Sequence, residues 1–172
     1  MFSKIDLCSM ALLKIGEKPI QSLREDSASA QLARNLFDAT TDTLLTAFPW
    51  RFATERITLN KNTDGEFVIP GNVLRIIKCD GKIAGNKIIY PSETTDILAV
   101  VKTEPEKFPD YFASLLTTKL AIEFSIPLVG DMNIFNMMSA LYERDFQTAK
   151  FIDSSMSVQS DGPDFSLINT RF

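Results

Sequence analysis

Two helix-ending signals near the N-terminus constrain the fold of this chain more than any other feature. The first apolar helical pattern stops at Gly16, a residue suited to the left-handed position after a helix, and Pro19 follows it. The second pattern stops at Pro49, because a proline disfavours the helical conformation in the residue before it. We therefore predict two helices, Ser3 to Ile15 and about Ser27 to Ala47, joined by a turn.

Beyond the second helix, the periodicity changes from that of helices to that of strands. Ile57 and Leu59 alternate with polar residues, and short apolar runs follow between turn residues. Asp80-Gly81 has hairpin chemistry, and Gly85-Asn86 is a second turn. The predicted strands begin at 54 and continue at 67–69, 73–79, 87–90 and 97–102. Short strands with frequent turns indicate a small antiparallel sheet or open barrel.

Helical periodicity returns after a charged connector. A third helix is expected from near Pro109 to the stop signals Pro127 and Gly130. Asp131 can cap a fourth helix, which should run to about Asp153. Its apolar residues recur on one face and predict a buried stripe of Ile134, Met138, Leu141, Tyr142, Phe146 and Ala149.

These segments together predict an α+β fold. A four-helix bundle-like core would hold a small antiparallel β-sheet or barrel inserted between its second and third helices. The helical domain would be discontinuous, formed by residues 1–53 and 104–153, with the β subdomain at 54–103. Residues 154–172 lose periodicity, are rich in serine and are expected to form an extended C-terminal arm.

Composition argues against most catalytic and metal-binding classes. The chain has no histidine, the commonest general base and metal ligand, and no phosphate-binding glycine pattern. We expect no catalytic residues, cofactor or metal. Cys8 and Cys79 are expected to be reduced thiols. The net charge of −4 is opposite to that of a nucleic-acid binder, and no run of apolar residues predicts a membrane span.

The order of these patterns resembles the tail tubular protein A family, the head-to-tail adaptors of short-tailed phages and related particles. The resemblance begins with LKIGEKPI at 13–20 and PWRFA at 49–53. It continues with FVIPGNVLRIIKCDG at 67–81, FPDYFASLLTTKLAIEFSIPL at 108–128 and YERDFQTAKFID at 142–153. It therefore spans roughly residues 3 to 153, with no catalytic residue among its motifs.

The resemblance implies a structural protein of the virion, assembled in the host cytoplasm. Its copies would form a dodecameric ring under the portal protein, extend the DNA channel and offer the tail nozzle an attachment platform. DNA would pass through the ring without specific binding. The free protein is expected to be monomeric or weakly associated and to order on the portal.

Three sets of residues are candidates for contacts with partners. Trp50 and Arg51 could anchor an interface, or Trp50 could close the end of the bundle. Lys82 and Lys87, with Lys78, could contact a partner or DNA, or could protect strand edges from unwanted pairing. The C-terminal arm offers apolar side chains and the forked guanidinium donor of an arginine, which suit a portal-binding segment. Alternatively, it could fold back on its own bundle. Its candidate residues are Phe165, Leu167, Ile168, Arg171 and Phe172.

Two other functions stay open at this point. Glu104, Glu106 and Asp110 could form the carboxylate pair of a peptidoglycan hydrolase, although acidic residues at a helix start also complement its dipole. A cytoplasmic interaction module unrelated to virions is the other alternative.

Overall fold

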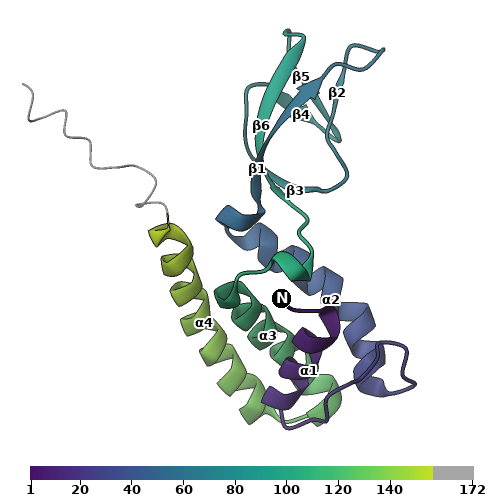
Figure 1. Ribbon diagram of the computed structural model, residues 1–172, viewed down its shortest axis with the longest axis vertical. Coiled ribbons are helices and arrows are strands. Elements are labelled where there is room, and N and C mark those ends of the chain that lie inside the picture. The colour runs from purple at the N-terminus through teal and green to yellow at the C-terminus, as the bar shows by residue number, and fades with distance from the viewer. Residues whose placement is uncertain (157–172) are drawn as a thin grey trace, which may run out of the picture.

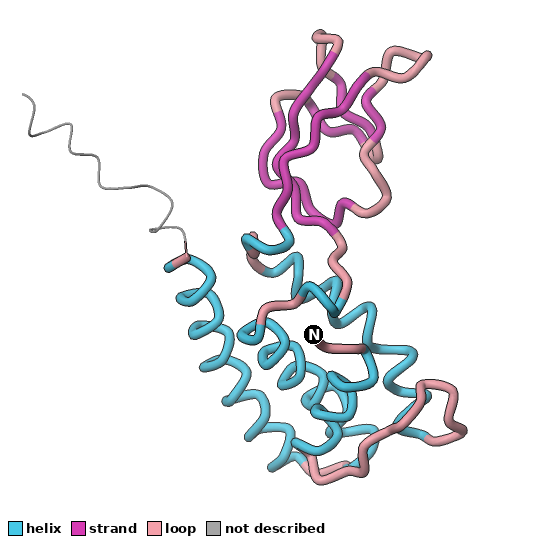
Figure 2. Tube along the Cα trace, in the orientation of Figure 1, coloured by secondary structure: helices cyan, strands magenta, loops and turns pink. Residues whose placement is uncertain are grey.

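The computed structural model describes residues 1–156 and has two parts of different structure (Figure 1). Four α-helices pack together, and two small sheets inserted between the second and third helices project from one end of the packed helices (Figure 2). The predicted α+β fold is therefore confirmed. The helices are α1 (Lys4–Lys14), α2 (Ala28–Ala47), α3 (Asp110–Phe124) and α4 (Met132–Ser155). Shorter turns are η1 (Arg51–Ala53), η2 (Pro105–Lys107) and the π-helical η3 (Ser125–Val129).

Local signals set the ends of α1 and α2. Ser3 and Asp6 form a reciprocal capping box, with each side chain accepting a hydrogen bond from the other residue's backbone N–H. Gly16 adopts the left-handed conformation with φ 83°. Phe48 is extended, as its position before Pro49 requires. The predicted boundaries of both helices hold to within one residue.

The third helix, α3, is the centre of the helical part. It packs against α1, α2 and α4, and its residues are buried on nearly every side. Within the described residues, Asp110–Val129 is the one helix long and apolar enough to cross a membrane. Its position among three other helices gives a sufficient reason for that composition, since a core helix needs apolar residues all round.

The fourth helix, α4, differs from its prediction. It packs mainly on α3, so one face of it is covered. Of the expected buried stripe, only Met138 and Ala149 are buried; Ile134, Leu141, Tyr142 and Phe146 are half-buried. The prediction was wrong for these four because periodicity shows which face is apolar, whereas the depth of burial depends on how many neighbours cover that face.

The β insertion, residues 54–101, consists of two three-stranded antiparallel sheets around one small core. The strands are β1 (Thr54–Asn60), β2 (Phe67–Val68), β3 (Val73–Cys79), β4 (Lys82–Ala84), β5 (Lys87–Ile89) and β6 (Thr94–Val101). One sheet has the order β1-β6-β3 and the other β2-β5-β4. Their shared core contains Leu59, Phe67, Ile88, Ile97 and Ala99.

The tight hairpin lies at the second predicted turn. Gly85-Asn86 joins the paired residues Ala84 and Lys87, and Gly85 has a positive φ of 60°. Asp80-Gly81 instead connects β3 to β4, which belong to different sheets, so the predicted hairpin there was wrong. The short strand β4 had no separate sequence signal.

Gly81 is needed where β3 passes into β4. A Cβ at this position would lie 2.5 Å from Ile88 Cγ2 and 2.8 Å from the backbone oxygen of Ile89. We expect Gly81→Ala to lower the free energy of unfolding by about 1–3 kcal/mol, because the backbone must shift to relieve the clash. Urea denaturation measures this loss in the free energy of unfolding. Gly71→Ala is the control, since its added Cβ would meet nothing within 4 Å, and equal losses in both variants would contradict the argument.

Candidate interaction surface and domain junction

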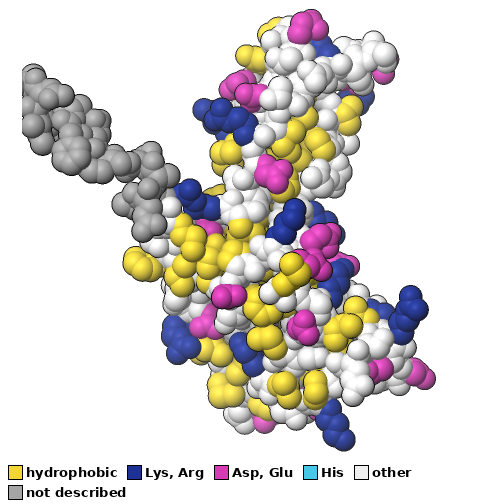
Figure 3. Space-filling view, in the orientation of Figure 1, with side chains coloured by type: hydrophobic (Ala, Val, Ile, Leu, Met, Phe, Trp, Pro, Cys, Tyr) yellow, Lys and Arg dark blue, Asp and Glu magenta, His cyan; other side chains and the backbone are white. Residues whose placement is uncertain are grey.

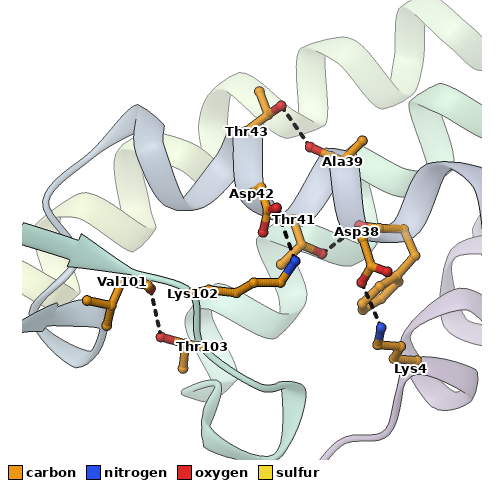
Figure 4. A network of polar contacts seen from close by, with 10 residues as sticks. Lys4, Asp38, Ala39, Thr41, Asp42, Thr43, Val101, Lys102 and Thr103 are labelled. Carbon is orange, nitrogen blue, oxygen red and sulfur yellow. Dashed lines mark hydrogen bonds and ion pairs between the residues drawn. The ribbon is translucent and has the colours of Figure 1, made fainter. Parts of the chain in front are cut away.

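The β insertion is attached to the end of α2 by polar contacts as well as by the chain itself. Arg75 Nη1 on β3 donates to the backbone oxygen of Thr46, 2.7 Å away, in the last turn of α2. Lys102 Nζ, just after β6, lies 3.2 Å from Asp42 Oδ2 on the same helix (Figure 4). Arginine near a helix C-terminus satisfies carbonyls that lack a partner in the helix. These contacts orient the insertion relative to the helices.

Trp50 lies at this junction and is fully buried. Its Nε1–H donates to the Leu44 oxygen at 2.9 Å. Its ring makes edge-to-face contacts with Phe48, Phe112 and Phe146, at centroid distances of 5.0, 5.3 and 6.0 Å. An indole without exposed surface offers a partner nothing to contact in this conformation. Of the two alternatives for Trp50, closing the end of the bundle matches its position, and Arg51 remains the exposed member of the pair.

Asp153, near the end of α4, is the buried charged residue of this junction that the sequence patterns missed. Its carboxylate is only 1% exposed. Both oxygens lie 3.2 Å from the Arg51 backbone nitrogen, and Oδ1 accepts a 2.6 Å hydrogen bond from the Tyr111 hydroxyl. Burial, followed by these contacts with Asp153, raises the pKa of the Tyr111 hydroxyl. An acidic residue in a last helical turn opposes the helix dipole, and that was the available signal.

Lys82 and Lys87 lie on one face of the β2-β5-β4 sheet. The register pairs Lys82 with Ile89 and Lys87 with both Ala84 and Val68, so all five side chains share that face. Ile89 is 64% exposed and Val68 45% exposed, while Lys87 forms an ion pair with Glu66. Lys78 belongs to the other sheet, on β3. The structure thus brings together two of the three lysines, beside exposed aliphatic side chains.

Several exposed apolar side chains also occur along α4 and at its C-terminal end. Phe151 is 75% exposed, and Met132, Met137 and Met156 are each more than half exposed. Figure 3 shows hydrophobic side chains over the upper part of the helices, near the base of the β insertion, with charged side chains interspersed. Hollows of about 410 and 220 Å³ flank α4 where it lies on α3. Exposed apolar surface of this kind is typical of contacts with other proteins.

Comparison with known families decides what this arrangement belongs to. A family model described as Tube, tail tubular protein, matches residues 5–153. The chain belongs to the tail tubular protein family. No curated protein matches it.

Membership makes this tail tubular protein a structural component of the bacteriophage tail, as its resemblance to the family predicted. The match covers both helical segments and the β insertion, and it ends at Asp153. The candidate arm residues Phe165, Leu167, Ile168, Arg171 and Phe172 lie beyond the match and outside the residues that the structure describes.

The carboxylates considered for hydrolysis, Glu104, Glu106 and Asp110, are all exposed. Asp110 lies in the first turn of α3, where a negative charge complements the helix dipole. A general acid of a glycosidase is normally held in an apolar pocket, and the surroundings of these three residues differ from that. Among residues 1–156, no three potential ligands are grouped so that they could hold a metal ion.

Proposed function

We propose that this tail tubular protein is a head-to-tail adaptor, which forms a dodecameric ring under the portal and extends the DNA channel. Exposed Phe151, which lies on the side of α4 opposite the buried Ala149, is the observation that carries the proposal. A helix covered mainly on one side, with Phe151 in water, is typical of a subunit completed by a neighbour. Contacts between unlike faces of successive copies close into a ring when the rotation between them allows it.

Each part of the chain then has a separate task. The discontinuous helical domain, residues 1–53 and 104–153, would form the ring wall. The β subdomain, 54–103, would face away from the portal and offer the nozzle the sheet face that carries Lys82 and Lys87. Exposed Ile89 and Val68 beside these lysines support contact with a protein rather than with DNA.

The C-terminal arm, residues 154–172, would bind the portal. Its apolar residues and Arg171 suit a segment that orders on a partner, and many copies in a ring offset the entropic cost of ordering through avidity. The acidic balance of the chain, −4 overall, suits a channel past which DNA slides without adhering. Assembly would occur in the host cytoplasm, without a catalytic step or a cofactor.

Negative-stain imaging of the protein mixed with its portal tests this role. The full chain alone should elute as a monomer in size-exclusion chromatography with light scattering, and should form a ring once the portal is added. Residues 1–156 should bind the portal at least about tenfold more weakly, a loss of about 1.4 kcal/mol per arm. Phe151→Asp should leave single-copy binding intact but prevent ring closure.

The outcomes separate the parts of the proposal. A stable ring without portal would contradict the monomer expectation. Full binding by residues 1–156 would contradict the arm, and normal rings from Phe151→Asp would contradict the α4 contact. Gln147→Asp, on the same exposed side of α4 but without an apolar side chain to lose, controls for added charge.

A further inference from the structure

The buried carboxylate of Asp153 joins three segments that are far apart in the sequence. It lies near the C-terminal end of α4. It accepts hydrogen bonds from the backbone N–H of Arg51 in η1 and from the hydroxyl of Tyr111 at the start of α3. Its exposure of 1% contrasts with the mainly exposed surface of this end of α4. Burying a carboxylate is costly unless its oxygens are hydrogen-bonded, so a position like this needs a structural reason.

The reason lies in η1, which lacks a cap of its own. The residue before it, Trp50, makes no side-chain capping bond, and Arg51 is the first residue of the turn. Orphan N–H groups at the start of a helical turn attract an acceptor with negative charge. Asp153 supplies that acceptor from another helix.

The capped turn leads directly into the β insertion. Only Phe52 and Ala53 separate Arg51, which Asp153 contacts, from β1, which begins at Thr54. Thr54 Oγ1 donates to the Trp50 oxygen at 2.7 Å, so the base of β1 is bound to the same short segment. A displacement of Asp153 would therefore release the N–H at the point from which the insertion projects.

The same carboxylate also fixes the end of α4. Around it, Phe151 is exposed, and Ala149 is the nearest fully buried apolar residue of the helix. Lys150 Nζ lies 5.6 and 5.5 Å from the ring centroids of Phe48 and Phe146, two cation–π contacts. Three residues after Asp153, the described part of the chain ends and the C-terminal segment begins.

We infer that Asp153 couples the position of the C-terminal end of α4 to the orientation of the β insertion. Any force or binding event that draws the end of α4 outward separates the carboxylate from Arg51 and Tyr111. The base of β1 then loses a restraint, and the insertion gains freedom relative to α2. This coupling is a property of the single chain and does not depend on the adaptor role.

A distance measurement between α2 and the β insertion tests this coupling. Neither labelled site lies on α4, so movement of α4 alone would not change the distance. Spin labels at the exposed positions Asn35 and Asn86 would report the orientation of the insertion by double electron–electron resonance. Cys79 is replaced by serine for this purpose, while Cys8 is buried and stays unlabelled. Exchange of the Arg51 amide, followed by NMR, reports the hydrogen bond itself.

In Asp153→Ala we expect the Asn35–Asn86 distance distribution to broaden about twofold, and the Arg51 amide to exchange at least about tenfold faster. The matched control is Asp145→Ala, also on α4, whose carboxylate contacts Thr118 and Arg144 rather than η1. It removes a carboxylate contact between α4 and α3 but leaves η1 untouched, so it should not broaden that distance. A folded Asp153→Ala protein with an unchanged distribution would overturn the inference.

Tyr111→Phe keeps the experiment decisive should Asp153→Ala fail to fold. It removes one hydroxyl, so the protein should fold while the carboxylate loses its 2.6 Å partner. We expect a smaller broadening in the same direction and faster exchange of the Arg51 amide. A distance distribution and an Arg51 amide exchange rate equal to those of the unmodified protein would contradict the proposed coupling.

Discussion

Replacing Trp50 with alanine should lower the free energy of unfolding by about 3–5 kcal/mol, the largest loss we expect from any single change. The indole is fully buried and makes edge-to-face contacts with three aromatic rings, which come from the end of α2, from α3 and from α4. Removing it leaves a cavity that rigid helices on several sides cannot fill by collapse. It also leaves the Leu44 oxygen without the indole N–H. Guanidinium denaturation followed by circular dichroism measures the loss.

Two matched variants separate packing from contact with a partner. Trp50→Phe keeps an aromatic ring but removes the N–H donor and part of the volume, so it should cost less than the alanine variant. Arg51→Ala keeps the backbone N–H that Asp153 accepts, so it should change stability by no more than about 0.5 kcal/mol. If Trp50→Ala retained full stability and lost only assembly, the buried role would be wrong and the interface role correct.

Alkaline pH should destabilise the protein through Cys8, which is the second large expected effect. Burial raises the pKa of the Cys8 thiol from 9.0 to about 12, with the negative charge of Asp38 adding to the rise and Lys4 opposing it. The folded state therefore keeps a proton that the unfolded state releases. The stabilisation is complete below about pH 9 and is lost as pH rises toward 12. The loss could reach about 4 kcal/mol, at 1.36 kcal/mol per pKa unit.

Denaturation of the native protein and of Cys8→Ala at about pH 8 and about pH 10.5 measures this dependence. The alanine variant should be somewhat less stable at the lower pH, because it loses a buried sulfur, but it should lose less stability on going to the higher pH. Burial also raises the pKa values of Tyr111 and Tyr142, so some alkaline destabilisation should persist in the variant. Parallel pH profiles for the two proteins would contradict the assignment to Cys8.

The pairing of the strands shows where sequence patterns stop being informative. Both Asp80-Gly81 and Gly85-Asn86 have turn chemistry, and only the second closes a hairpin between paired strands. β3 pairs with β6 in one sheet and β4 pairs with β5 in the other, so Asp80-Gly81 carries the chain from one sheet to the next. A turn signal depends on two residues, whereas the choice of partner depends on which distant strand completes a shared core.

The candidate surfaces also combine features that the sequence shows with features that only the tertiary structure shows. Lys82 and Lys87 could be singled out from the sequence, but their common face with Ile89 and Val68 required the register. The exposed side of α4 and the buried Asp153 could not be predicted from periodicity. Each depends on what packs against α4, and the helix has α3 on one side and little on the other.

The sequence by itself determined where α1 and α2 end, that a β insertion separates the helices, and that the chain belongs with tail tubular proteins. Caps, prolines and glycines act over a few residues, and those interactions are already present in the local sequence. Only the tertiary structure decided that Trp50 is buried, that Phe151 on α4 is exposed, and that Asp153 caps a turn a hundred residues away. Burial and pairing are properties of segments brought together by folding, and no local pattern records them.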